Sequence, residues 1–299
     1  MARSIPYIFC RYRMAVQEQA LDVHGQRQFL NEEQGNGLPH GRLRADRPQA
    51  NALIMEPNEF ESDGEICLTW SVGIRAGVRI QTEYDSQTRT RTLQLVADPH
   101  IRFAPVLALP ERGIMAIEDR SGDEQISARQ AIGAFRTIMQ TVHDGDGSFE
   151  VHHGDPEDIE RWLDEWELKE YSYTIAPLNP ISASAFAERR SEAMKRENVW
   201  KDAGKVLPPE GQSMQPNGGI IQEANELSEV GYGQRGFRGR TPDGHIAHVP
   251  KPRFHDDRHK NLAEQQKPHF VRVMFEPDNG QDTFLGGQVA SALRRFYGG

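Results

Sequence analysis

Cysteine is scarce in this chain of 299 residues, which has only Cys10 and Cys67. Each lies in a segment with the composition of a β-strand, so we expect two buried free thiols rather than a disulfide. The scarcity excludes a disulfide-stapled secreted domain and any Cys-x-x-Cys redox or metal motif. It favours a bacterial-type cytoplasm as the location of the protein.

Long apolar runs are also missing. No stretch approaches the roughly 18 consecutive apolar residues of a membrane-spanning helix. Residues 1–6 lack the charged and then apolar layout of a secretory signal. An apolar content of 37% and a charged content of 26% are typical of a globular protein, and the length suits one large domain or two modest ones.

Positive charge is low overall but unevenly distributed. The net charge of −9 argues against a uniformly basic nucleic-acid binder. Residues 143–170 contain 11 acidic residues against Arg161 and Lys169, a balance of −9. Residues 231–272 contain nine Lys and Arg against four acids, a balance of +5, with five histidines besides. The sequence therefore predicts one acidic and one basic surface.

Established catalytic motifs are missing as well. The chain has no Gly-x-Ser-x-Gly elbow, phosphate loop or dinucleotide-binding fingerprint. His255 and His259, or His152 and His153 with Asp155, could contribute to a metal site, but a solvated polar loop is the simpler interpretation of both. Glu167-Leu-Lys169 has the spacing of half a metal-dependent nuclease site, here at a helix end. An enzyme has little support, and we expect no cofactor and no resident metal.

Residues 103–142 form the best-defined part of the sequence. Two apolar runs, 103–109 and 114–118, flank a Pro-Glu-Arg-Gly turn and predict a hairpin. Ser127 and Gln130 have the spacing of a capping box, and apolar residues at steps of three and four predict a helix to Val142 that covers the hairpin.

These patterns predict an α+β fold, mainly an antiparallel sheet covered by helices. Residues 1–142 would form a β-meander with its covering helix. Residues 143–299 would form a second α+β portion that contains a Gly-rich basic hairpin.

The basic hairpin, residues 231–253, carries the candidate site. Glycines alternate there with basic and aromatic residues, and a Thr-Pro-Asp-Gly turn interrupts the pattern. Glycine lets backbone approach a ligand, arginine donates to phosphate, and aromatic rings can stack on bases. The candidate nucleic-acid-binding residues are Tyr232, Arg235, Phe237, Arg238, Arg240, His245, Lys251 and Arg253. The alternative is a twisted edge hairpin with solvated arginines and glycines that serve bulges.

The order of these features resembles a bacterial, often prophage-linked family of unknown function. The matching stretches are 175–180 (Ile-Ala-Pro-Leu-Asn-Pro), 216–218 (Pro-Asn-Gly), and the Gly-rich hairpin from Gly231 to Pro250. The first half is similar in layout to the phage-exclusion A proteins of lambda-type prophages, which bind DNA. The resemblance implies DNA binding in phage exclusion, and it transfers no catalytic residue. The overall acidity of this chain departs from a simple DNA binder.

We therefore expect a non-enzymatic, nucleic-acid-associated protein of the phage-exclusion or antiviral-defence type. The alternatives are a metal-dependent nuclease or toxin, and a protein-interaction module. Candidate partners are DNA or RNA, a protein bound at the acidic 143–170 surface, and a second copy of the chain in a homodimer.

Overall fold

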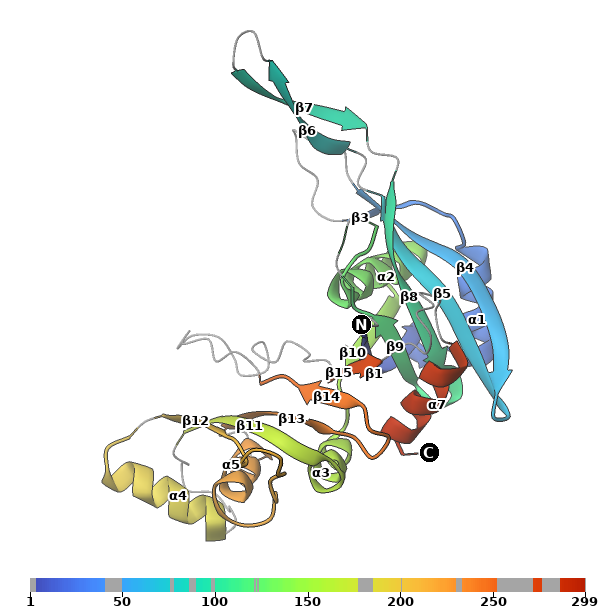
Figure 1. The fold of residues 1–299 in the computed structure, drawn as a ribbon. Helices are drawn as coiled ribbons and strands as arrows, with labels where there is room; N and C mark the ends of the chain where they lie inside the picture. The colour runs from blue at the N-terminus through green and yellow to red at the C-terminus, as the bar shows by residue number, and fades with distance from the viewer. Residues whose placement is uncertain are drawn as a thin grey trace. The chain divides into compact units, whose positions relative to one another are not determined.

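The computed structural model describes residues 4–40, 50–75, 78–85, 90–97, 100–120, 122, 124–176, 185–199, 201–229, 233–251, 271–275 and 286–298. The chain divides into two units (Figure 1). Unit 1 comprises Met1–Val151 and Glu276–Gly299, and unit 2 comprises His152–Phe275. Each unit combines an antiparallel sheet with helices, which confirms the predicted α+β class.

Unit 1 contains a sheet with the strand order β1-β9-β8-β5-β4-β3, and β2 and β10 also pair with β1. Its strands are β1 (Ile5–Val16), β2 (Gln19–Ala20), β3 (Leu38–His40), β4 (Ala50–Ser62), β5 (Glu65–Arg75), β8 (Ile101–Leu109), β9 (Ile114–Glu118) and β10 (Gly147–His152). The predicted hairpin is β8–β9, joined by a short 3-10 turn, η1 (Pro110–Arg112). Gly113 ends that turn in the left-handed region, with a φ of 61°. Strands β6 (Val78–Asp85) and β7 (Thr90–Ala97) pair with each other as a separate two-stranded sheet.

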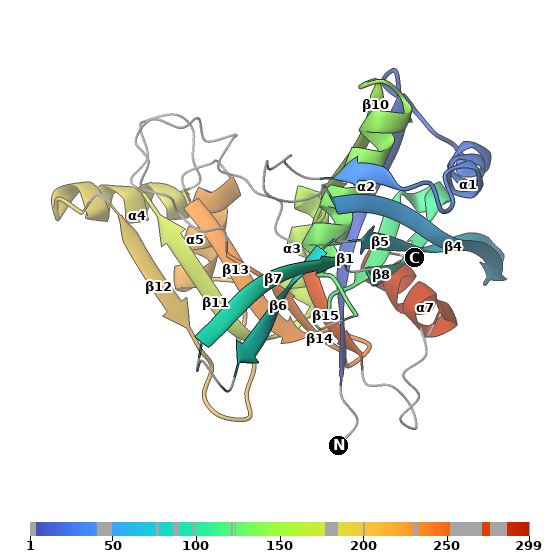
Figure 2. The ribbon, with the colours of Figure 1, turned by 90° about the horizontal axis from the view of Figure 1, so that it is seen from above.

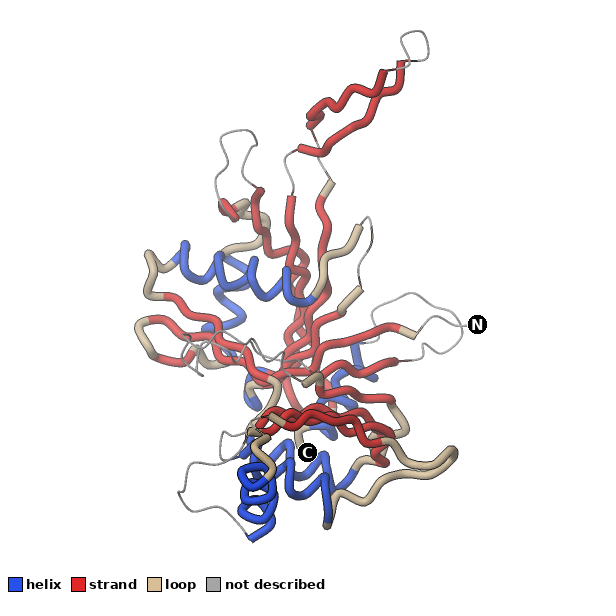
Figure 3. Tube along the Cα trace, turned by 90° about the vertical axis from the view of Figure 1, so that its left-hand side faces the viewer, coloured by secondary structure: helices blue, strands red, loops and turns tan. Residues whose placement is uncertain are grey.

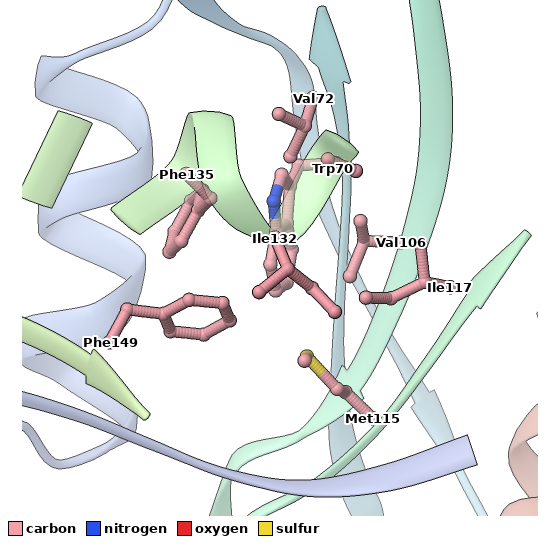
Figure 4. Close-up of a pocket in the computed structure, with 9 residues that line it drawn as sticks. Trp70, Val72, Val106, Met115, Ile117, Ile132, Phe135 and Phe149 are labelled. Carbon is pink, nitrogen blue, oxygen red and sulfur yellow. The ribbon is translucent and has the colours of Figure 1, made fainter. Parts of the chain in front are cut away.

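Helix α2 (Ala128–Val142) begins where the sequence predicts. The Ser127 side chain accepts from the Gln130 backbone amide, and the Gln130 side chain accepts from the Ser127 amide, so the capping box is complete. The buried stripe of α2 packs on the sheet through Phe135, whose ring centroid lies 5.5 Å from that of Trp70 on β5. The side chains around Phe135 leave only a small apolar gap of about 10 Å³ (Figure 4).

Helix α7 (Gly286–Phe296) packs on the opposite face of the same sheet. The Phe296 ring meets Phe9 of β1 edge-on at 5.3 Å. Strand pairing places the side chains of Phe9 and Thr69 on the same face of the sheet. The side chain of Trp70 points to the opposite face, because side chains alternate along a strand. Figure 2 shows α2 and α7 on either side of the sheet. Helix α1 (Val23–Glu32) lies against β4.

The position of α7 differs from the expected division of the chain at residue 143. The C-terminal residues 276–299 belong to unit 1, together with most of β10. The partners of α7 lie far earlier in the chain: it contacts β8 and β9, and Arg294 contacts the β4–β5 turn at a separation of 231 residues. Contacts at such separations leave no local pattern in the sequence.

Unit 2 is a five-strand antiparallel sheet with helices on one face. The strand order is β12 (Asp202–Val206), β11 (Glu167–Ile175), β13 (Gly233–Arg240), β14 (Ile246–Val249) and β15 (Val271–Phe275). The helices are α3 (Pro156–Glu165), α4 (Ala185–Arg196) and α5 (Gly219–Glu229). They gather on one side of these strands (Figure 3), which we call the helix-covered face; the other side is the open face.

Candidate nucleic-acid interface

The predicted basic hairpin is formed by β13 and β14. Its turn is closed by a hydrogen bond from the Gly244 amide to the Thr241 carbonyl, 2.8 Å long, and Gly244 has a φ of 84°. Strand β13 pairs with β11 on one side and with β14 on the other, so it lies inside the sheet. The alternative of an edge hairpin is therefore wrong.

Alternation along β13 sends Phe237 and Arg235 to the helix-covered face. Phe237 is 1% exposed, and its ring packs against Trp166 at 5.3 Å. A ring buried in the core cannot stack on a base, so the structure contradicts that expectation for Phe237. The guanidinium of Arg235 is held inside unit 2 by α5: its Nη1 contacts the Asn225 side chain and pairs with Glu229 Oε1 at 2.9 Å. Because the Arg235 side chain is only 11% exposed, it joins helix to sheet rather than meeting a phosphate.

The glycines of β13 also serve packing. A Cβ on Gly236 would lie 2.2 Å from the backbone nitrogen of Lys251, and one on Gly239 would lie 3.0 Å from the Glu167 carbonyl oxygen. These two glycines therefore leave room for neighbouring backbone inside the sheet, and not for a ligand as the sequence predicted.

The remaining arginines of β13, Arg238 and Arg240, are exposed on the open face. Neither forms an ion pair within the part of the chain that the structure describes. Cross-strand register places four residues in one row across β11, β13, β14 and β15: Glu170, Arg238, His248 and Arg272. With strands about 4.8 Å apart, the row spans roughly 14 Å. Lys205 of the neighbouring strand β12 pairs with Glu170 at 2.9 Å.

The open face is therefore basic at neutral pH. We call Lys205, Arg238, Arg240 and Arg272 the basic quartet; Glu170 is the acidic member of the row. Burial lowers the pKa of His248; Arg238 and Arg272 lower it further, against an opposing effect of Glu170. His248 is therefore neutral at pH 7, and the positive charge comes from the quartet.

Two other predicted residues have structural partners. Lys251 Nζ donates to the Tyr173 carbonyl at 3.2 Å and to Thr174 Oγ1 at 3.0 Å. Burial, and secondarily Lys201, lowers the pKa of Lys251. The His245 ring packs on Phe275 with centroids 4.6 Å apart. Tyr232, Arg253, and the possible metal ligands His255 and His259 lie outside the described residues.

Lys205 and Arg272 were missed in the sequence. Arg272 stands between two buried valines of β15, so its exposure follows from strand alternation. Lys205 lies at the start of a stretch rich in glycine and proline, residues 204–219, yet it belongs to β12. A period-two pattern would have identified Arg272, but only the pairing of β12 with β11 brings Lys205 to the open face beside Glu170.

The structure divides the predicted acidic stretch 143–170 between the two units and places the Glu-x-Lys motif at the start of a strand. Residues 143–151 belong to unit 1 and residues 152–170 to unit 2. Asp158 is 2% exposed and bonds to the Asp155 amide, so it caps α3. Glu167 and Lys169 open strand β11, not a helix end. The Lys169 ammonium donates to the Gln212 carbonyl at 3.0 Å. Within the described residues, no three His, Cys, Asp or Glu side chains gather as metal ligands.

Comparison of the sequence with protein-family models gives no match, and comparison with curated proteins gives no significant relative. No helix in the described ranges is long and apolar enough to cross a membrane.

Proposed function

We propose that unit 2 binds nucleic acid by contacting the phosphate backbone with its open face. The single observation that carries the proposal is the basic quartet, whose members lie on strands β12, β13 and β15 of the open face, with only one acidic residue in the central row. Arginine forks suit phosphate oxygens, and lysine adds a point charge.

The overall charge of −9 does not oppose this role at close range. Screening limits the reach of a surface charge to about 8–10 Å at physiological salt. A phosphate on the open face therefore interacts chiefly with the quartet. In this proposal the protein is non-enzymatic and acts in the cytoplasm as a homodimer in phage exclusion or antiviral defence.

The test is the salt dependence of binding to labelled DNA and RNA duplexes. Four phosphate contacts predict a slope of log K against log salt of about −3.6, at roughly 0.9 for each phosphate neutralised. The double variant Arg238→Gln/Arg272→Gln should flatten the slope by about 1.8 and weaken binding equally across unrelated sequences.

Lys195→Gln/Arg196→Gln on α4 is the matched control, because it removes the same charge from exposed positions of the helix on the other side of the sheet. It should leave the slope near the wild-type value. The proposal fails if the wild type does not bind at low salt, or if both double variants behave alike. Strand scission with Mg²⁺ in the same tubes would refute the non-enzymatic role and favour the nuclease.

A further inference from the structure

A second site lies in unit 1, on the sheet face that also carries α7. A groove of about 330 Å³ is formed there by β5, β8 and β9, by β4 at one rim and by residues that follow β9 at the other. This volume lies at the lower end of the range for small-molecule sites, roughly 300–1,000 Å³. Apolar side chains, Phe103 and Pro105 among them, line it together with a few polar groups.

The floor of the groove holds a buried charge. Glu118 is 5% exposed, and its Oε1 lies 2.7 Å from Arg120 Nε and 3.4 Å from the donor Gln125 Nε2. The Tyr7 hydroxyl donates to the other carboxylate oxygen at 3.4 Å. Burial, reinforced by Glu118, raises the pKa of Tyr7, so its hydroxyl stays protonated and remains a donor. Glu118 is buried and Arg120 is partly exposed. A buried carboxylate is costly even when it is paired, so its position beneath a groove points to a role beyond packing.

The rim of the groove carries two polar groups that have no partner within the described residues. Glu56 sits in a β-bulge of β4, where the register with β5 shifts, and its backbone is left-handed with a φ of 50°. Non-glycine residues in this region are strained and concentrate at functional sites. Ser71 is 8% exposed, and its side chain lines the same groove.

The rim opposite Glu56 is held in place by backbone hydrogen bonds. The Phe103 amide donates to the Glu124 carbonyl at 3.1 Å, and the Ile126 amide donates to the Phe103 carbonyl at 3.2 Å. Gln125 is thereby fixed beside β8, so the groove has a preformed wall.

We propose that this groove binds a small organic cation, an alkylamine or alkylguanidine. Since Arg120 already neutralises Glu118, the unpaired carboxylate of Glu56 sets the sign of the ligand charge. An ammonium or guanidinium group would donate to Glu56 and to the Ser71 hydroxyl. A short alkyl chain would lie on Phe103 and Pro105. This site is independent of the open face of unit 2.

The proposal is tested on the full chain by isothermal titration with n-butylamine and n-butylguanidine, with butyrate as the anion of matched length. We expect the cations to bind with a Kd of about 1 mM or tighter and butyrate not to bind. Glu56→Gln should weaken cation binding about tenfold, because an ion pair with a carboxylate becomes a hydrogen bond to an uncharged amide. Glu61→Gln is the matched control: it removes the same charge from an exposed position of β4 that does not line the groove, and it should bind like the wild type.

A second variant separates binding from folding. Ser71→Val adds bulk where Ser71 lines the groove and should block both cations. A thermal melt of each variant checks that it is folded. The proposal is wrong if neither cation binds at about 10 mM, if butyrate binds as well as the cations, or if folded Glu56→Gln binds them like Glu61→Gln does.

Discussion

Arg294 connects the C-terminal helix α7 to the β4–β5 turn of unit 1, and its replacement tests that connection. The Arg294 side chain is 9% exposed. Its Nη2 donates to the Ser62 carbonyl at 2.7 Å, its Nη1 contacts the Asp63 carboxylate, and its Nε lies 2.9 Å from Glu65 Oε2. Glu65 is held on its other oxygen by Arg112 at 2.6 Å. Arg294→Met keeps the aliphatic stem and removes all three contacts.

The expected loss can be estimated contact by contact. The Asp63 side chain is 72% exposed, so its pair contributes at most about 1 kcal/mol. The hydrogen bond to Ser62 involves a charged donor and contributes about 1.5–3 kcal/mol. Glu65 is 19% exposed and retains Arg112, so its unpaired oxygen adds little. The free energy of unfolding of unit 1 should fall by about 2–4 kcal/mol, which lowers the melting temperature by roughly 5–15 °C for a unit of this size.

The assay is thermal and urea unfolding of the full chain followed by circular dichroism. Arg295→Met is the matched control, because Arg295 is exposed on the same helix and should change stability by less than about 0.5 kcal/mol. Arg294→Lys should be intermediate, since lysine keeps the charge but not the fork of donors. If Arg294→Met and Arg295→Met unfold at the same temperature and urea concentration, then α7 is not anchored through Arg294, and the expected loss of about 2–4 kcal/mol is refuted.

Two further substitutions probe the interior of each unit. Gly236→Ala should destabilise unit 2 by about 1–3 kcal/mol, because the added Cβ meets the Lys251 backbone. Gly133→Ala in α2 is the control: no atom lies within 4 Å of the added Cβ, so it should be neutral or stabilising in the same urea titration. Equal effects of the two substitutions would contradict the packing role of Gly236. Burial lowers the pKa of His40, whose Nδ1 lies 3.1 Å from Thr137 Oγ1. As the pH falls, His40 therefore takes up a proton in the unfolded chain before it does so in the folded chain. The contribution of His40 to the free energy of unfolding is fully present above about pH 6.5 and is lost as the pH decreases below that value. His40→Gln should remove part of that loss between about pH 7.5 and pH 5.5, and an unchanged pH profile would show that His40 is not its source.

Local chemistry was sufficient to predict much of unit 1 from the sequence. A capping box requires only Ser127 and Gln130 three positions apart, and the stripe that contains Phe135 repeats at helical spacing, so α2 could be predicted to the residue. The β8–β9 hairpin was predicted for a similar reason, because Gly113 follows a Pro-Glu-Arg turn between two apolar runs. These signals lie within a few residues of one another, where backbone geometry is determined by neighbours in the chain.

The candidate sites depended on the tertiary structure. Alternating residues along β13 predict two faces, but only the packing of α3 and α5 decides that Phe237 and Arg235 are covered while Arg238 is exposed. The row that joins Arg238 to Arg272 is a matter of strand register, and the residues of β11 and β15 that complete it are about 100 positions apart. The groove of unit 1 likewise brings Glu56 of β4 to the same cavity as Glu118 of β9. Such juxtapositions arise from hydrophobic burial and hydrogen-bond pairing over the whole unit, and no short stretch of sequence specifies them.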